Sequence, residues 1–90
     1  MATVRFTPDL VRLFPALVDV ELEAATVADL IRALEERHPR LSTYLVDEHG
    51  ALRTHVNVFV GESRIRDRVR LSDPVSDRDE VYIVQALSGG

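Results

Sequence analysis

The stretch that decides the fold runs from residue 26 to residue 37 and reads Thr26-Val27-Ala28-Asp29-Leu30-Ile31-Arg32-Ala33-Leu34-Glu35-Glu36-Arg37. Its large apolar residues recur at i, i+3, i+4 and i+7, which is the spacing of one face of an amphipathic helix. Thr26 is a suitable N-cap, and Pro39 ends the pattern soon after Arg37. The stretch therefore predicts a helix over residues 26–37 with one face buried.

Two stretches with apolar residues at every second position precede this helix. Residues 3–7 place Val4 and Phe6 on one face, and residues 18–22 do the same with Val18, Val20 and Leu22. This period is typical of half-buried strands, and two in succession favour an antiparallel hairpin. The segment between them, residues 9–15, is too apolar for a free loop, and we expect it to cover one end of the core.

Two further strands are predicted after the helix. In residues 54–60 valine occupies the alternate positions 56, 58 and 60, and residues 81–86 are almost entirely apolar. A short helical turn is expected over residues 41–46. The order is two strands, a helix, a strand, an irregular stretch and a last strand, which predicts an α+β roll with one main helix packed across the sheet.

The composition restricts the possible functions. The 90 residues make one small domain with a limited core, and the formal net charge of −4 argues against nucleic-acid binding. No apolar run approaches the roughly 18 residues of a membrane span, and no basic segment followed by an apolar stretch opens the sequence. We therefore expect a cytoplasmic protein that does not bind membranes.

No catalytic or metal-binding constellation is readable in the sequence. There is no cysteine, and the three histidines lack the spacing of metal ligands, so we expect no metal. His38 is interpreted as a cation at the end of the helix and His55 as an exposed strand residue. No nucleophile and base are paired at a recognisable spacing. These observations favour a protein that is not itself an enzyme.

The sequence ends in Leu87-Ser88-Gly89-Gly90, directly after the last predicted strand. The reactive group at Gly90 is an α-carboxylate, whose pKa of about 3.3–3.7 makes it an anion and a poor electrophile. Conversion to an acyl adenylate would make its carbonyl attackable. Residues without a Cβ atom also allow a tail to thread a narrow channel. The alternative is a frayed end without function.

The face of the sheet away from the helix offers a possible docking surface. If the alternate valines of residues 54–60 face the helix, then Phe59, Tyr82 and Val84 are left on the opposite side of the sheet. A contiguous group of exposed apolar residues marks an interface. The alternative is that a loop covers these three side chains.

Several of these features together resemble one known family. The hairpin, the helix over residues 26–37, the strand Val56-Asn57-Val58-Phe59-Val60 and the exit through residues 86–90 are similar to the ubiquitin-like sulfur carriers of the ThiS/MoaD family. The resemblance covers essentially the whole chain, and residues 41–50 look most like the CysO type. Arg78-Asp79 departs from the Gly-Asp that the family often has before its last strand. The resemblance implies a β-grasp roll with a mixed sheet, a single domain over residues 1–90 and a flexible tail over residues 87–90.

The resemblance also implies a function. An E1-like enzyme of the MoeB/ThiF type would use ATP to adenylate Gly90, and a sulfur donor would convert the adenylate to a thiocarboxylate. A synthase such as a cysteine synthase homologue would accept the sulfur. The chain would bind no cofactor and would act as a protein co-substrate. Gly89 would thread the active site, while Leu87 and Ser88 would contact the partner together with the sheet face.

Other interpretations stay open at this point. The sulfur could be destined for cysteine, molybdopterin, thiamine or another sulfur-containing metabolite, and the chain could be a permanent subunit of a molybdopterin synthase. It could be a protein modifier that Gly90 joins to lysines of target proteins. It could also be a β-grasp binding module that ends in two glycines by accident.

Overall fold

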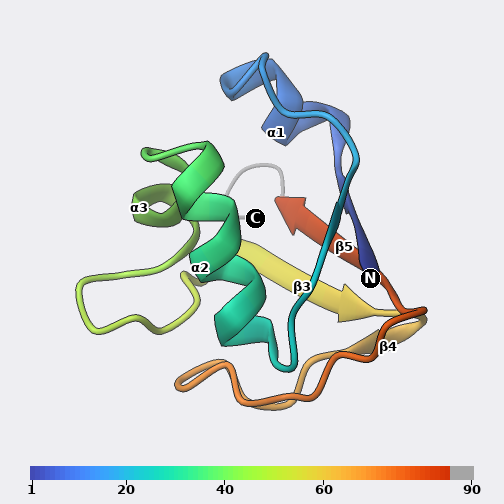
Figure 1. The fold of residues 1–90 in the computed structure, drawn as a ribbon. Coiled ribbons are helices and arrows are strands. Elements are labelled where there is room, and N and C mark those ends of the chain that lie inside the picture. Colours follow the sequence, from blue (N-terminus) through green and yellow to red (C-terminus); the bar gives the residue numbers. More distant parts are fainter. Residues whose placement is uncertain (86–90) are drawn as a thin grey trace.

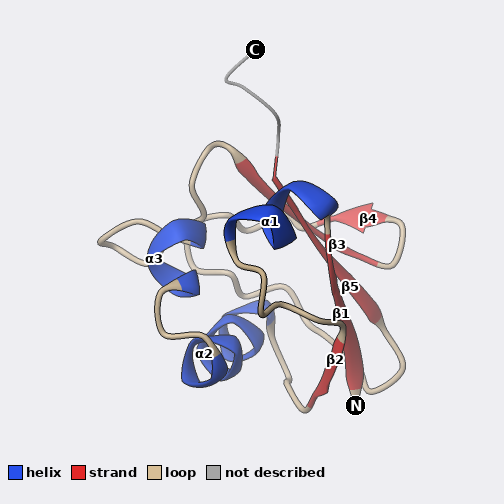
Figure 2. Cartoon of the chain, turned by 90° about the horizontal axis from the view of Figure 1, so that it is seen from above, coloured by secondary structure: helices blue, strands red, loops and turns tan. Residues whose placement is uncertain are grey.

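A sheet with helices against one of its faces makes up the structure, a computed structural model that describes residues 1–85 (Figure 1). Seen from above, α2 and α3 lie on one side of the sheet (Figure 2). The elements, in chain order, are β1 (Ala2–Phe6), α1 (Pro8–Leu13), β2 (Val20–Leu22), α2 (Val27–Arg37), α3 (Leu41–Leu45), β3 (Val56–Val60), β4 (Ser63–Arg64) and β5 (Glu80–Gln85).

The sheet has five strands in the order β2-β1-β5-β3-β4. The first and last strands of the chain, β1 and β5, run parallel at its centre, and the other neighbouring pairs are antiparallel. The sheet is therefore mixed, and the predicted α+β roll of β-grasp type is confirmed. Because β5 pairs with both β1 and β3, its carboxyl end is held from two sides.

The inner face of the sheet packs against α2. Val4 of β1, Val58 of β3, and Val81 and Ile83 of β5 are all completely buried. The helix contributes the apolar face that its sequence predicts: Val27, Leu30, Ile31 and Leu34 are buried. Apolar burial of this kind is the main favourable term in folding, so the alternation of the strands and the period of the helix together determine the core.

The amino end of α2 is capped by its own N-cap and by a distant loop. The Thr26 hydroxyl accepts a hydrogen bond from the amide of Asp29 at 3.2 Å, as the sequence predicts. The amide of Val27 donates to the carbonyl of Asp73 at 3.0 Å, and that of Ala28 donates to the carbonyl of Leu71 at 2.9 Å. Leu71 takes a left-handed conformation with φ of 55°. Three amides that a helix leaves without intrahelical partners are thus satisfied.

Asp67 organises this capping loop. Its carboxylate accepts hydrogen bonds from the amides of Val69 at 3.1 Å and Arg70 at 2.9 Å, and from the amide and hydroxyl of Ser72. The Arg70 amide and the Ser72 hydroxyl are the main causes that lower the pKa of Asp67 to about 2. Hydrogen bonds to a carboxylate favour its charged form, so the loop depends on an ionised Asp67.

The hairpin prediction is correct in topology and wrong in one detail. Val18 was expected to face inward, but 68% of its surface is exposed, whereas Leu17 is buried. The amide of Leu17 donates to the carbonyl of Phe14 at 2.9 Å, so the chain is still turning there and β2 begins only at Val20. The apolar segment before this turn forms α1, whose Leu10 is fully buried.

The interpretation of His55 as an exposed strand residue is wrong. The amide of Val56 donates to the carbonyl of Arg53 at 3.0 Å, so this part of the chain forms a turn and β3 begins at Val56. His55 lies in that turn with its ring edge-to-face against Tyr44, at a centroid distance of 5.0 Å. Its Nε2 atom is buried.

Across residues 1–85, no helix combines the length and the apolar character needed to cross a bilayer.

Candidate functional site: the open face and the root of the tail

Four strands each place one side chain in a single row across the open face, which is the face of the sheet turned away from α2. The register pairs Arg5 of β1 with Tyr82 of β5, Tyr82 with Phe59 of β3, and Phe59 with Arg64 of β4. Directly opposed residues on one face of a sheet are close enough to contact one another. The row is therefore a continuous strip with aromatic rings at its centre and an arginine at each end.

The centre of the open face is an apolar patch of three residues. Phe59 and Tyr82 are cross-strand partners, and Val84 lies two residues further along β5 on the same side. All three are half-buried, so no loop covers them completely. The structure thus brings together the three sheet residues that the sequence singles out.

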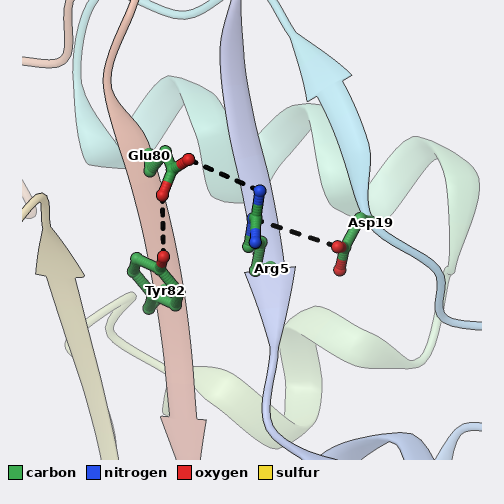
Figure 3. A network of polar contacts seen from close by, with 4 residues as sticks. All are labelled: Arg5, Asp19, Glu80 and Tyr82. Carbon is green, nitrogen blue, oxygen red and sulfur yellow. Dashed lines mark hydrogen bonds and ion pairs between the residues drawn. The ribbon is translucent and has the colours of Figure 1, made fainter.

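A polar network bounds the patch on its β1 side (Figure 3). The Tyr82 hydroxyl donates to Oε2 of Glu80 at 2.7 Å, and a guanidinium nitrogen of Arg5 lies 3.4 Å from Oε1 of the same carboxylate. Arg5 also approaches Asp19 at 3.9 Å. The hydrogen bond to Glu80, with some desolvation, raises the pKa of Tyr82 above its ordinary value. The same hydrogen bond restrains the position of the phenol.

An arginine bounds the patch on the other side. The guanidinium carbon of Arg64 lies 5.7 Å from the centroid of the Phe59 ring, within the range of a cation–π contact. Sequence reasoning missed Arg5, Glu80 and Arg64 as parts of this surface. The alternation of each strand gives the face of each residue, but only the register between strands shows which residues are neighbours.

The last described residue, Gln85, forms what we call the root of the tail. Its amide donates to the Thr7 hydroxyl at 3.4 Å, and the amide of Thr7 donates to the carbonyl of Ile83 at 3.3 Å. Val56 pairs with Gln85 from the other side. The root is therefore held on one side by Thr7, which follows β1, and on the other side by β3. The predicted site residues Leu87, Ser88, Gly89 and Gly90 lie outside the described residues.

The histidines form no centre of their own. In the part of the chain up to residue 85, no three histidine, aspartate or glutamate side chains lie close enough to hold a metal ion. His38 is the C-cap of α2, as the sequence suggests, and His55 packs on Tyr44.

The mixed sheet, the helix across one face and the central last strand define a ubiquitin-like protein of the β-grasp class. Within that class the chain belongs to the ThiS family, whose model matches residues 7–90. Structures similar to the chain include CysO and a small archaeal modifier protein, so the family comprises small ubiquitin-like proteins of the carrier and modifier type.

Three solved structures of similar proteins can be compared with the chain. A chain of the Amycolatopsis orientalis BexX/CysO complex is 31% identical, with a TM-score of 0.84 and complete coverage of both chains. CysO of Mycobacterium tuberculosis is 26% identical with a TM-score of 0.81, and the match covers 97% of this chain and all of CysO. SAMP1 of Haloferax volcanii is 26% identical with a TM-score of 0.77, covering 99% and 98%. No curated protein sequence matches the chain significantly.

Proposed function

We propose that this chain is a sulfur carrier whose Gly90 is activated and then loaded with sulfur. The observation that carries the proposal is that the family match extends through residue 90, so Gly89-Gly90 lies inside the region that the family shares. An E1-like enzyme of the MoeB/ThiF type supplies the chemistry. The Gly90 carboxylate attacks the α-phosphate of ATP, and pyrophosphate leaves. A sulfide equivalent then attacks the acyl carbon, AMP leaves, and a thiocarboxylate remains.

The role of the chain in this reaction is to present its last residues to the enzyme. Gln85 is held by Thr7 and by its pairing with Val56, so the residues that follow start from a fixed point. Holding a reacting group in a defined place converts part of a bimolecular problem into an intramolecular one. Glycines at positions 89 and 90 then allow close approach of the backbone to the walls of an active site.

The apolar patch is the proposed docking surface for the activating enzyme. Aromatic side chains near the centre of an interface tend to carry most of its binding energy. Phe59 and Tyr82 meet this description, with Val84 extending the patch toward the root and Leu87 and Ser88 continuing the contact. Arg5 and Arg64 at the ends of the row add charge at the rim, which favours specificity more than affinity.

The sulfur acceptor is proposed to be a biosynthetic synthase in the cytoplasm. Similarity to two CysO chains supports a cysteine synthase homologue as the synthase. Molybdopterin, thiamine and other sulfur-containing metabolites are further destinations of the same chemistry.

The decisive experiment follows the terminal atom. Incubated with the E1-like enzyme, ATP and a sulfide source, the intact protein should exchange one oxygen of Gly90 for sulfur, which intact-mass spectrometry and fragmentation detect. Deleting Gly89 and Gly90, or adding one residue after Gly90, should abolish the exchange. Gly89→Val should slow it through steric exclusion from the channel. Exchange that survives deletion of both glycines would overturn the proposal.

A second candidate is a ubiquitin-like modifier, favoured by the similarity to SAMP1, whose structure is described as that of a small archaeal modifier protein. In that case the activated Gly90 would form an isopeptide bond with a lysine of another protein. The sequence contains no lysine, so the chain offers no side-chain amine to a second copy. Conjugates to other proteins without any sulfur-bearing product would favour this candidate.

A further inference from the structure

A groove runs between the end of α1 and the connection from α2 to α3. Two adjoining hollows, one of about 410 Å³, share Phe14, Pro39 and Arg40 in their walls. Leu13 and Pro15 complete the α1 side. A hollow of this size accommodates a few side chains of a bound segment.

Phe14 and Tyr44 line the groove, and their rings belong to an aromatic cluster that continues to His55. Phe14 meets Tyr44 edge-to-face at a centroid distance of 5.6 Å, and Tyr44 meets His55 in the same way at 5.0 Å. Leu13 stands at the edge of this cluster with 53% of its surface exposed. A large exposed apolar residue next to aromatic side chains is the pattern of an interaction surface.

The rim of the groove is positively charged. Arg37 and Arg40 line it, and no carboxylate does. Neither guanidinium has an ion-pair partner within 4.0 Å among residues 1–85. The chain as a whole carries a formal charge of −4, so the positive charge at the rim is opposite in sign to the net charge of the chain. Complementary charge across an interface speeds association and suppresses wrong partners, and here it selects an acidic partner.

The groove lies at the end of the molecule where β5 finishes. Thr7, the N-cap of α1, accepts the hydrogen bond from Gln85 at the root of the tail. His55, at the far end of the aromatic cluster, directly precedes Val56, the partner of Gln85. Figure 1 shows the arrowhead of β5 directed toward the region between α1 and α3. The groove and the apolar patch therefore flank the same exit on opposite sides of the sheet.

We propose that this groove is a second docking surface, which receives an acidic segment with a large apolar side chain from the E1-like enzyme. The inference rests on the proposed function for the identity of the partner. The apolar side chain enters beside Leu13 and Phe14, while its flanking carboxylates face Arg37 and Arg40. Contact on both sides of the exit would align the root of the tail with the active site.

The test measures binding of the purified E1-like enzyme, without ATP, by calorimetry. The double variant Arg37→Glu and Arg40→Glu should weaken binding roughly tenfold, and Leu13→Ser should weaken it severalfold. The matched controls carry equal changes elsewhere. Arg66→Glu with Arg78→Glu reverses two exposed arginines in other loops, and Val18→Ser alters another exposed apolar residue.

Added salt should weaken binding of the parent more than binding of the charge-reversed variant, because screening acts on the attraction that the variant lacks. In turnover assays the charge-reversed variant should raise KM for the carrier, because the groove contacts contribute to binding of the enzyme. Nuclear magnetic resonance of the labelled parent chain gives an independent readout: amide signals of Ala16, Arg40 and Thr43 should shift or broaden when the enzyme is added.

The outcomes separate the groove from the chemistry. If the groove variants bind like the parent while the parent still acquires sulfur, the groove proposal is overturned and the proposed function stands. If the parent binds, loses affinity in the groove variants, and never acquires sulfur, the groove stands and the sulfur chemistry fails. If the parent does not bind the enzyme at all, both are overturned.

Discussion

The two faces of the central sheet are built from the same strands and differ in almost every physical respect. On the inner face, Val4, Val58 and Ile83 are completely buried in the hydrophobic core. On the open face, Tyr82 and Phe59 are half-buried. The Tyr82 hydroxyl donates to Glu80, which Arg5 also contacts, and Arg64 lies over the Phe59 ring.

The difference shows how a small domain separates stability from recognition. Buried apolar side chains tolerate little change, because a cavity or an unpaired charge among them is expensive. Half-buried aromatic side chains contribute less to folding and keep part of their surface free for a partner. One alternating strand supplies side chains to both faces. A mutation at Val58 should therefore mainly lower stability, whereas a mutation at the neighbouring Phe59 should mainly weaken binding to a partner.

The largest expected effect breaks the inner face. Val58→Asp places an unpaired carboxylate in the core, which is expected to lower the free energy of unfolding by about 4 kcal/mol or more. The control is Asn57→Asp, one residue earlier on the open face, where the side-chain oxygen accepts a hydrogen bond from Arg68 at 2.9 Å and an aspartate oxygen can do the same. Urea denaturation measures both. A parent-like midpoint for Val58→Asp would show that the inner face is assigned wrongly.

A smaller effect tests the open face. Phe59→Ala and Tyr82→Ala should each change the free energy of unfolding by about 1 kcal/mol, because both side chains are half-buried. Each should weaken binding to the activating enzyme by about 2 kcal/mol, as expected for an aromatic anchor. Glu21→Ala, an exposed residue on the edge strand β2, two strands away from β5, is the control. Undiminished affinity in the double aromatic variant would remove the open face from the docking model.

The smallest expected effect concerns the dependence of stability on pH. The buried side chains of residues 1–85 include no charged group, so this dependence must come from groups outside the core. Asp67 has a pKa of about 2 in the folded chain, below the ordinary value near 3.9. The stability that its ionised form provides is complete above about pH 4 and is lost as the pH falls toward 2.

Asp67→Asn removes this ionisation. The variant should be less stable than the parent at pH 5, and the gap should narrow between pH 4 and pH 2, as urea midpoints at each pH would show. Glu48→Gln, an exposed residue, serves as the control and should leave the pH profile unchanged. A gap that stays constant across this range would mean that the Asp67 carboxylate does not hold the loop through its charge.

The elements that the sequence predicts well are those whose pattern is local. The helix from Val27 to Arg37 has a cap, an apolar period of 3.6 and a proline beyond its end, and the valines of β3 alternate without interruption. The family match and the structural neighbours confirm the β-grasp fold that these elements and the glycine-rich end suggested.

What the sequence did not reveal depends on contacts between distant residues or on weak local signals. Thr7-Pro8-Asp9 is a usable helix start, but α1 is only six residues long and lacks a full apolar period. The error at Val18 arose because an apolar pattern continues through a turn. The groove joins Phe14 to Pro39, which no local pattern can pair, and the ends of the aromatic row follow from register alone.

The central position of β5 has a consequence for the order in which the molecule is made. A chain still being synthesised that has not reached residue 80 contains β1 with β2, and β3 with β4, but no strand to join the two pairs. Contacts of such long sequence separation form late and slowly. The strand that closes the core is also the strand that places Gln85, so a chain that holds this residue in position has already folded. An enzyme that recognises the assembled sheet beside this exit would thereby discriminate between folded and incomplete chains.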